Sequence, residues 1–482
     1  MKENFHQYIE KLPPTILTIF GATGDLSLDY LLPALSHMIE EGIFPPNFRL
    51  VAVSRRPWTT DEYLSFLKQE FKARNRVVSE KLLSAISYFA GDFDHKSSFN
   101  ALAGVLGDKD IQAHSCFNRL FYFATDPKYF EFLSHVLKDA GLLKSCAKHN
   151  RMVRVLVEKP FGSNEQTAKK LNKLLLTYFK EQQIYRIDHF LGKEVVQNLL
   201  VMRFANDFLE PVWNREHIDH IEVSVLESEL VGKRVNFYDK TGAIKDMLQN
   251  HILHMLALTL MDRPQKLAPE EIAKQKLKIL RSLQLFTAAK AKTDLVIGQY
   301  SDYRSSGGLK SETETFAALK VTSSHPRWKG VPFFLRTGKG LARKVAEISI
   351  HFKQQKNKPK EFLTAAPNVL TFQIQPDESV RMQISNKTVG FGVELHTADL
   401  VFGYKEAFKH EIPAAYERLL LDFIQGDQRL FLASGEVEAA WRFVDSIIPY
   451  LENATLERYL PGCNGPKAAD KLVSKYGGWW TK

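Results

Sequence analysis

A histidine lies on the apolar face of a predicted helix. If residues 242–261 form an α-helix, Ile244, Leu248 and His251 share one stripe, so His251 points toward the core. A single histidine on such a face is more often a hydrogen-bonded core residue than a reactive one. Here Asp246 and two amide side chains crowd the same two turns, which favours a buried polar site.

His251 has the chemistry of a general base, because histidine titrates close to neutral pH. Removal of hydride from a carbon that carries a hydroxyl group requires a base to accept the hydroxyl proton. A carboxylate on the second ring nitrogen would fix the tautomer and stabilise the imidazolium. Asp188, in the segment RIDHFLGK, is the candidate carboxylate. Spacing alone cannot show that the two side chains meet.

The same segment contains a candidate anion site. If a helix begins near Asp188, His189 and Lys193 lie one turn apart and can converge on one phosphate at the helix N-terminus. Taken alone, the pair is equally compatible with a solvated turn.

A lysine follows another apolar run, Val153–Val157, which is predicted to be a buried strand. Lys159 stands just past its carboxyl end, where ligands bind in open parallel sheets. Pro160 comes next, and a cis peptide bond there would fix the direction of Lys159.

A glycine-rich turn follows the first predicted strand, Ile16–Phe20, and precedes a helix. This order of strand, glycines and helix is typical of a site where a pyrophosphate contacts backbone N–H groups at a helix N-terminus. The expected coenzyme contacts are Gly21, Thr23, Gly24, Asp25 and Leu26.

Two arginines, Arg55 and Arg56, end the next predicted strand. An NAD enzyme usually has an acidic residue at this point to accept hydrogen bonds from the ribose. Arginines suit the additional 2′-phosphate of NADP instead. The alternative is a pair of merely exposed cations; of the two, we favour Arg55 as the phosphate contact.

These residues require elements that hold them. The first part of the chain alternates apolar strands with helices, which predicts a parallel sheet covered on both faces. The strands expected are 16–20, 50–53, 120–123 and 153–157, and the helices are 28–41, 60–73, 79–89 and 129–142.

The pattern changes near residue 190. Strands expected at 218–227, 316–322, 346–352, 369–374 and 380–384 indicate a large, mostly antiparallel sheet, with helices 242–261, 268–282 and 413–424 beside it. The pattern therefore predicts an α/β Rossmann-type coenzyme domain, 1–188, followed by a β+α domain with a large, mostly antiparallel sheet, 189–482.

Composition excludes several classes of protein. Lys and Arg total 65 against 55 Asp and Glu, a formal charge of +10, but the excess is scattered and no groove-reading motif occurs. We therefore expect no nucleic-acid partner. The N-terminus lacks a signal-peptide core and no apolar run could span a bilayer, so a cytoplasmic protein without a membrane partner is expected. Three cysteines without CxxC spacing argue against a cysteine zinc site or a secreted disulfide framework, and no metal is expected.

The segments GATGDL, RVLVEKPFG, RIDHFLGKEVVQN and GAIKDMLQNH together resemble, in order and spacing, the motifs of the glucose-6-phosphate dehydrogenase family. SETETFAALKV, RWKGVPFFLRTGKGL and PAAYERLLLDFIQGD extend the resemblance to residues 15–465. It implies NADP-dependent oxidation of glucose 6-phosphate at C1. It also implies a homo-oligomer, either dimer or tetramer, whose large sheet forms the dimer interface.

The resemblance also assigns roles by position. His251 matches the catalytic base and Asp188 its carboxylate, while Lys159 matches a lysine between sugar and coenzyme and Arg55 the 2′-phosphate contact. The matching sugar-phosphate contacts are His189, Lys193, Glu227, Asp246, Lys339 and Lys344, and Asp92 and Phe93 fall where the coenzyme pocket is lined.

Three positions depart from the family pattern. Tyr30 replaces a usual lysine, Phe190 replaces a tyrosine that donates to the phosphate, and Lys245 replaces an arginine. Two rivals keep the fold: a coenzyme-binding sensor without catalysis, and a dehydrogenase acting on an unphosphorylated sugar. A turnover assay distinguishes the enzyme from a sensor. A comparison of glucose with its 6-phosphate as substrate distinguishes it from a dehydrogenase of unphosphorylated sugars.

Overall fold

The computed structural model describes residues 12–45, 47–93, 95–144, 152–303, 308, 310–355, 357–408, 412–475 and 480. The chain forms two compact units. The first comprises residues 1–162, 166–192 and 413–434, and the second comprises 163–165, 193–412 and 435–482.

The first unit is built on a six-stranded sheet in the order β3-β2-β1-β4-β5-β6, in which every pair is parallel. Its strands are β1 (Thr15–Phe20), β2 (Arg49–Ser54), β3 (Ile86–Ala90), β4 (Asn118–Phe123), β5 (Val153–Val157) and β6 (Ile184–Arg186). All side chains of β1 and β5 are buried, as expected for central strands covered on both faces. This is the Rossmann-type arrangement that the sequence predicts.

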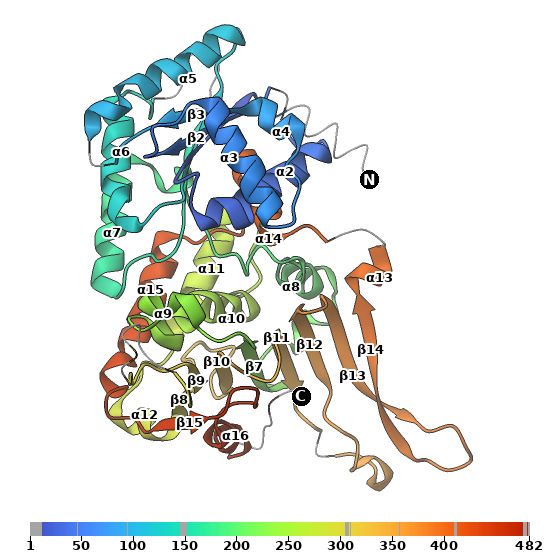
Figure 1. Cartoon of the computed structure of the whole chain (residues 1–482). Coiled ribbons are helices and arrows are strands. Elements are labelled where there is room, and N and C mark those ends of the chain that lie inside the picture. The colour runs from blue at the N-terminus through green and yellow to red at the C-terminus, as the bar shows by residue number, and fades with distance from the viewer. Residues whose placement is uncertain are drawn as a thin grey trace. The chain divides into compact units, whose positions relative to one another are not determined.

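Helices cover both faces of this sheet, with α5, α6 and α7 on one side and α2, α3 and α4 on the other (Figure 1). The helices of the unit are η1 (Ser27–Leu31, a π-helix), α2 (Leu32–Glu40), α3 (Thr60–Ala73), α4 (Glu80–Ala85), α5 (Asn100–Gln112), α6 (Phe130–Asp139), α7 (Glu165–Tyr178) and α14 (Ala415–Gln425). The start of α3 is fixed by a capping box in which Thr59 and Glu62 satisfy each other's backbone N–H groups.

The second unit contains a nine-stranded sheet in the order β14-β13-β12-β11-β7-β10-β9-β8-β15. Pairs β7–β10 and β8–β15 are parallel and the others antiparallel, so the sheet is mixed but mostly antiparallel. Its strands are β7 (Ile218–Leu226), β8 (Leu295–Tyr300), β9 (Phe316–Val321), β10 (Phe333–Gly338), β11 (Val345–Phe352), β12 (Val369–Gln375), β13 (Ser379–Lys387), β14 (Leu395–Gly403) and β15 (Leu456–Tyr459).

The helices of the second unit are α8 (Glu194–Ala205), α9 (Val235–Tyr238), η7 (Ile244–Ile252, a π-helix), α10 (Leu253–Leu260), α11 (Pro269–Ser282), α12 (Ala288–Asp294), α13 (Tyr404–Phe408), α15 (Ser434–Asp445) and α16 (Lys467–Ser474). Every residue of α10 is buried, so this helix lies inside the unit. It continues directly from η7, whose residues are described below.

One predicted helix was wrong in its second half. Residues 79–89 form helix α4 only to Ala85, and Ile86–Ala90 is the edge strand β3, paired in parallel with β2. The aromatic and β-branched residues Ile86, Tyr88 and Phe89 favour a strand, and pairing with β2 decides between the two. The sequence also did not reveal that residues 413–434, with α14, join the first unit.

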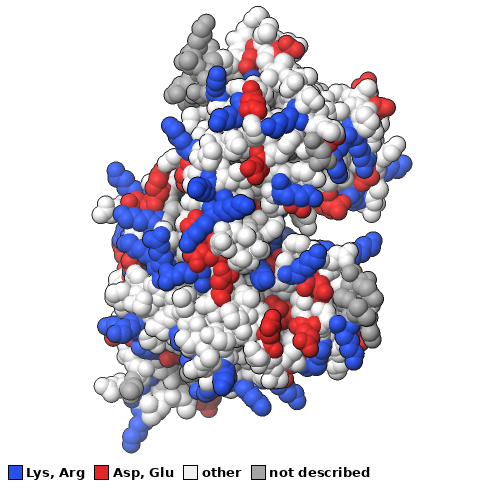
Figure 2. All heavy atoms as spheres, turned by 90° about the vertical axis from the view of Figure 1, so that its left-hand side faces the viewer, with Lys and Arg blue, Asp and Glu red and all other residues white. Residues whose placement is uncertain are grey.

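Charged side chains of both signs are interspersed on the face shown in Figure 2, in agreement with a scattered basic excess. Among the described residues, no helix is both long and apolar enough to cross a membrane. Cys116 takes part in a disulfide bond, which the sequence pattern did not predict, and Cys463 is a free thiol.

Candidate functional site

The glycine-rich turn after β1 is held close to the sheet by its backbone. Gly21 has φ of +92°, and a Cβ atom there would clash with the carbonyl oxygen of Ala124, so only glycine fits. The N–H of Gly21 donates to Val53 O at 2.9 Å, and the Tyr63 hydroxyl donates to Ala22 O at 3.0 Å.

The other residues of this turn face outward. Gly24 and Asp25 are exposed, and Thr23 and Leu26 are half-buried. The turn therefore presents backbone and small side chains at the start of the following helix, which suits a pyrophosphate.

The two arginines after β2 differ in their surroundings. The guanidinium of Arg56 lies over the rings of Trp58 and Phe66, at 4.6 and 5.2 Å from their centroids. Arg55 is exposed. Arg56 is exposed as well, but its guanidinium is held over these two rings, so Arg55 is the better candidate to reach an anionic ligand.

The predicted coenzyme contacts Asp92 and Phe93 follow β3. Phe93 is buried against Phe20, Phe99 and Tyr129, with ring centroids at 6.4, 5.9 and 5.5 Å. Its side chain is therefore a core residue of the first unit. Asp92 is half-buried and its N–H is bonded to Ser98 Oγ at 3.0 Å.

Lys159 lies at the carboxyl end of β5 and is half-buried, and the Lys159–Pro160 peptide bond is cis, as the sequence suggested. The preceding Glu158 is a buried carboxyl that sequence reasoning missed. The hydroxyls of Tyr122 and Tyr416 donate to its Oε1 at 2.5 and 3.3 Å.

Burial raises the pKa of Glu158 to about 7, although both tyrosines and Lys159 favour its charged form. A charged residue placed directly after an all-buried strand was the signal available in the sequence. Groups with pKa values displaced toward neutrality are common at functional sites.

Asp188 and His189 follow β6 in a tight turn of the first unit. The Ile187 N–H donates to Val157 O at 3.1 Å, which anchors the segment to β5. Asp188 is 1% exposed, and its Oδ1 accepts the Phe190 N–H at 3.0 Å. The turn therefore fixes the direction of a buried carboxylate.

The expected helical spacing of His189 and Lys193 is wrong. Helix α8 begins at Glu194 with Lys193 at its N-cap, so His189 precedes the helix. The ring of His189 instead stacks parallel to Tyr416, at 6.5 Å between centroids.

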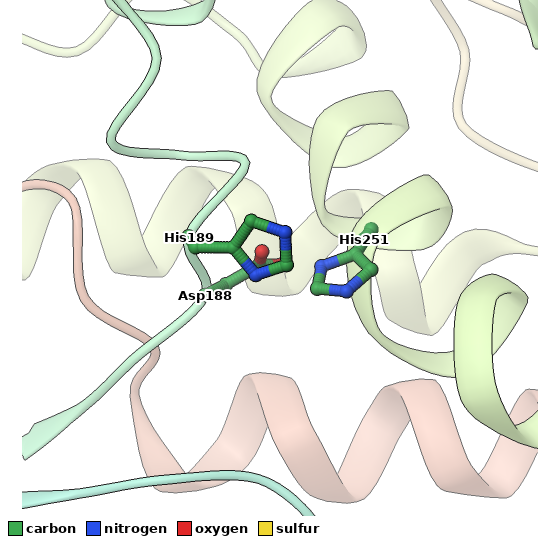
Figure 3. A group of neighbouring side chains, drawn as sticks. All are labelled: Asp188, His189 and His251. Carbon is green, nitrogen blue, oxygen red and sulfur yellow. The ribbon is translucent and has the colours of Figure 1, made fainter. Parts of the chain in front are cut away.

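His251 lies in the second unit, on the π-helix η7. Figure 3 shows its side chain on this helix, and Asp188 and His189 on the segment after β6. His251 is 1% exposed and Asp246 is 6% exposed. The stripe predicted for His251 assumed the number of residues per turn of an α-helix, and a π-helix has more residues per turn. All residues from Asp246 to Ile252 are buried, so His251 is buried all the same.

Glu314 caps the start of η7 and was not predicted. Its Oε1 accepts the Ile244 N–H at 3.1 Å, and its carbonyl oxygen accepts the Ala243 N–H at 3.0 Å. Gly242 has φ of +64°, and a Cβ atom there would clash with this carboxyl. Burial raises the pKa of Glu314 to about 7.

The remaining predicted lysine ligands of the second unit each lie near a different glutamate. The Lys339 ammonium contacts the Glu227 carboxylate, and it lies 5.3 Å from the Tyr238 ring centroid. The structure thus brings Glu227 and Lys339 together at the ends of β7 and β10. Lys344 is more exposed and is 3.1 Å from Glu229.

Lys193 is separate from these and lies 3.8 Å from Glu378 Oε1. Glu378 also accepts the Val195 N–H at 3.1 Å, so a carboxylate already interacts with the N-terminus of α8.

Comparison with known proteins identifies a family. Residues 18–198 match "Glucose-6-phosphate dehydrogenase, NAD binding domain", and residues 200–481 match "Glucose-6-phosphate dehydrogenase, C-terminal domain". The chain is 38% identical over 489 residues to the glucose-6-phosphate 1-dehydrogenase of Rhizobium meliloti, covering 97% of each chain. It is 37% identical over 481 residues to that of Borreliella burgdorferi, covering 96% of this chain and 97% of the other.

Solved structures agree with these relatives. A glucose-6-phosphate dehydrogenase in complex with its substrate is similar with a TM-score of 0.88 and 32% identity, covering 98% of this chain and all of the other. Glucose-6-phosphate 1-dehydrogenase from Mycobacterium avium has a TM-score of 0.83 at 30% identity, covering 98% of this chain and 99% of the other.

Proposed function

The chain belongs to the glucose-6-phosphate dehydrogenase family, and we propose that it oxidises D-glucose 6-phosphate at C1 to 6-phospho-D-glucono-1,5-lactone with NADP as hydride acceptor. The observation that carries the proposal is the similarity, over 98% of the chain, to a dehydrogenase structure in complex with this substrate. The oxidoreductase class follows from family membership, and the choice of NADP rests on Arg55.

The first unit would hold the coenzyme. Glycine at position 21 lets the turn pack closely against Ala124, and the exposed residues Gly24 and Asp25 leave the start of the following helix open to a ligand. Arg55 would pair with the 2′-phosphate, and Lys159 would lie between coenzyme and sugar. When bound, the coenzyme supplies a nicotinamide ring that accepts hydride.

His251 would take the proton from the hydroxyl on C1 through one ring nitrogen. Asp188 would accept a hydrogen bond from the N–H of the other ring nitrogen and stabilise the imidazolium that forms. Support comes from the burial of both side chains and from the turn that fixes Asp188. His251 would hold this proton while hydride leaves C1 for the coenzyme, and would release it to solvent before the next turnover.

The substrate would be recognised by charge at one end and hydrogen bonds at the other. His189 and Lys193 would bind the phosphate, and Lys344 would add a further cation. Glu227, Asp246 and Lys339 would contact the sugar. The contact between Glu227 and Lys339 supports this, since it keeps a carboxylate and an ammonium side by side.

The experiment follows reduction of NADP spectrophotometrically with glucose 6-phosphate, and with glucose as the comparison. We expect turnover with the phosphate ester only. His251→Asn should lower kcat by about a hundredfold or more while coenzyme binding, measured by fluorescence titration, is unchanged. His217→Asn, an exposed histidine, is the matched control. Equal turnover of wild type and His251→Asn would contradict the assignment of the base.

The assembly would be a homodimer or a homotetramer built through the large sheet. Apolar side chains are strongly exposed on strand β14 and the hairpin before it, which supports an interface there: Val389, Phe391, Val393, Leu400, Val401 and Phe402. The cytoplasmic location expected from the sequence stays a prediction.

A further inference from the structure

Three buried side chains with metal-binding atoms meet on the second sheet. His220 and Glu222 lie two residues apart on β7, and therefore on the same face. His351, on the neighbouring antiparallel strand β11, is paired directly with His220. Their exposed fractions are 5%, 1% and 3%.

The distances among these groups fit a metal site. The Glu222 carboxylate lies near both imidazoles, with Oε1 3.6 Å from His220 Nε2 and Oε2 3.7 Å from His351 Nε2. One ligand atom from each residue lies within 4.8 Å of the other two. Ligands about 2.1 Å from a tetrahedral Zn²⁺ are about 3.4 Å apart, so only small side-chain movements are needed.

A second carboxylate orients the first histidine. His220 Nδ1 is 2.7 Å from Asp219 Oδ2. When Nδ1–H donates to this carboxylate, Nε2 carries the lone pair and faces Glu222, which is the carboxylate–histidine arrangement of many metal sites. His220 Nε2 is buried and has no hydrogen bond to any residue that the structure describes.

We propose that His220, Glu222 and His351 bind one divalent transition-metal ion, with Zn²⁺ as the expected ion. Two imidazoles and one carboxylate form a ligand set that suits Zn²⁺, and a water molecule can complete a tetrahedron. The two rings now stack with centroids 4.0 Å apart and 15° between planes. Binding requires them to turn apart so that both Nε2 lone pairs point at one ion.

This site is distinct from the proposed catalytic residues. His220 precedes Glu227 by seven residues along an extended strand, a distance of about 23 Å. The ion would tie β7 to β11 in the middle of the sheet, so its expected effect is on stability and not on turnover. The competing arrangement is one without metal, in which Glu222 acts as a counter-ion of Arg336, whose positive charge it attracts.

The test uses the untagged full-length chain after removal of metal with a chelator. Titration with Zn²⁺, followed by calorimetry and elemental analysis, should give one ion per chain and a raised Tm. Co²⁺ should give the visible absorption bands of a tetrahedral site. Glu222→Gln and His351→Gln should abolish these bands, and Asp219→Asn should weaken affinity by about tenfold or more.

Two control variants separate this site from other histidines. His217→Gln, an exposed histidine just before β7, and His251→Asn, the proposed base, should both bind Zn²⁺ as the wild type does. Loss of binding in His251→Asn, or retention in folded His351→Gln, would overturn the proposal. If the buried variants do not fold, the wild type decides: absence of a tetrahedral Co²⁺ spectrum and of a stoichiometric ion would overturn it.

Discussion

Arg55 is the residue on which the choice of coenzyme depends. Arg55 and its neighbour Arg56 are both exposed, and the guanidinium of Arg56 is stacked on Trp58. We expect Arg55→Ala to raise KM for NADP by at least tenfold and to change KM for NAD little, because only NADP carries the 2′-phosphate. Arg56→Ala is the matched control and should affect both coenzymes equally. Steady-state kinetics with the two coenzymes checks this, and an equal loss in Arg55→Ala would refute the role.

Phe190 is the residue at which substrate binding departs from the family pattern. Its side chain is 5% exposed and lies beside His189, with ring centroids 4.8 Å apart. We expect Phe190→Tyr to lower KM for glucose 6-phosphate by about fivefold, which corresponds to one neutral hydrogen bond of about 1 kcal/mol. An unchanged or higher KM would mean that the added hydroxyl does not reach the phosphate.

At the scale of the element, Glu314 determines how η7 begins. Its pKa is raised by burial from 4.5 to about 7. Between these values the folded protein binds more protons than the unfolded chain, so the free energy of unfolding decreases as pH rises through this window. Glutamine keeps the oxygen that accepts the Ile244 N–H but does not ionise.

We therefore expect Glu314→Gln to have a higher Tm than the wild type at about pH 8, and the difference to shrink toward about pH 5. Glu312 is an exposed glutamate on the same segment, and Glu312→Gln should have nearly the same Tm as the wild type at both pH values. Thermal unfolding across the pH range measures both. A lower Tm for Glu314→Gln than for the wild type at about pH 8 would show instead that Glu314 is stabilising as a carboxylate.

At the scale of the whole molecule, the exposed apolar side chains of β14 belong to the proposed assembly. Leu400 is 62% exposed in the single chain. We expect Leu400→Asp to shift the oligomer toward monomer on dilution, because a carboxylate would be desolvated at the interface. Leu460→Asp, at an apolar residue 70% exposed, is the control. Sedimentation velocity measures the change, and equal behaviour of the two variants would place the interface elsewhere.

The sequence by itself determined the local features. The strand, glycine turn and helix at Gly21, the helix at residues 60–73, and the buried strand before Lys159 depend on periodicity, capping and backbone freedom, which are properties of neighbouring residues. The family resemblance rests on the same local motifs, and the comparisons confirm it.

Features that depend on contacts between segments distant in sequence were decided only by the tertiary structure. Residues 86–90 became a strand because β2 lies beside them, and α14 joined the first unit although it is far along the chain. Glu314 caps η7 although 70 residues separate it from Ile244. His351 faces His220 because of the register between β11 and β7. No short sequence motif encodes either contact. The physical reason is that register and packing are selected by burial of the whole sheet, so a residue's partner is set by elements remote in sequence.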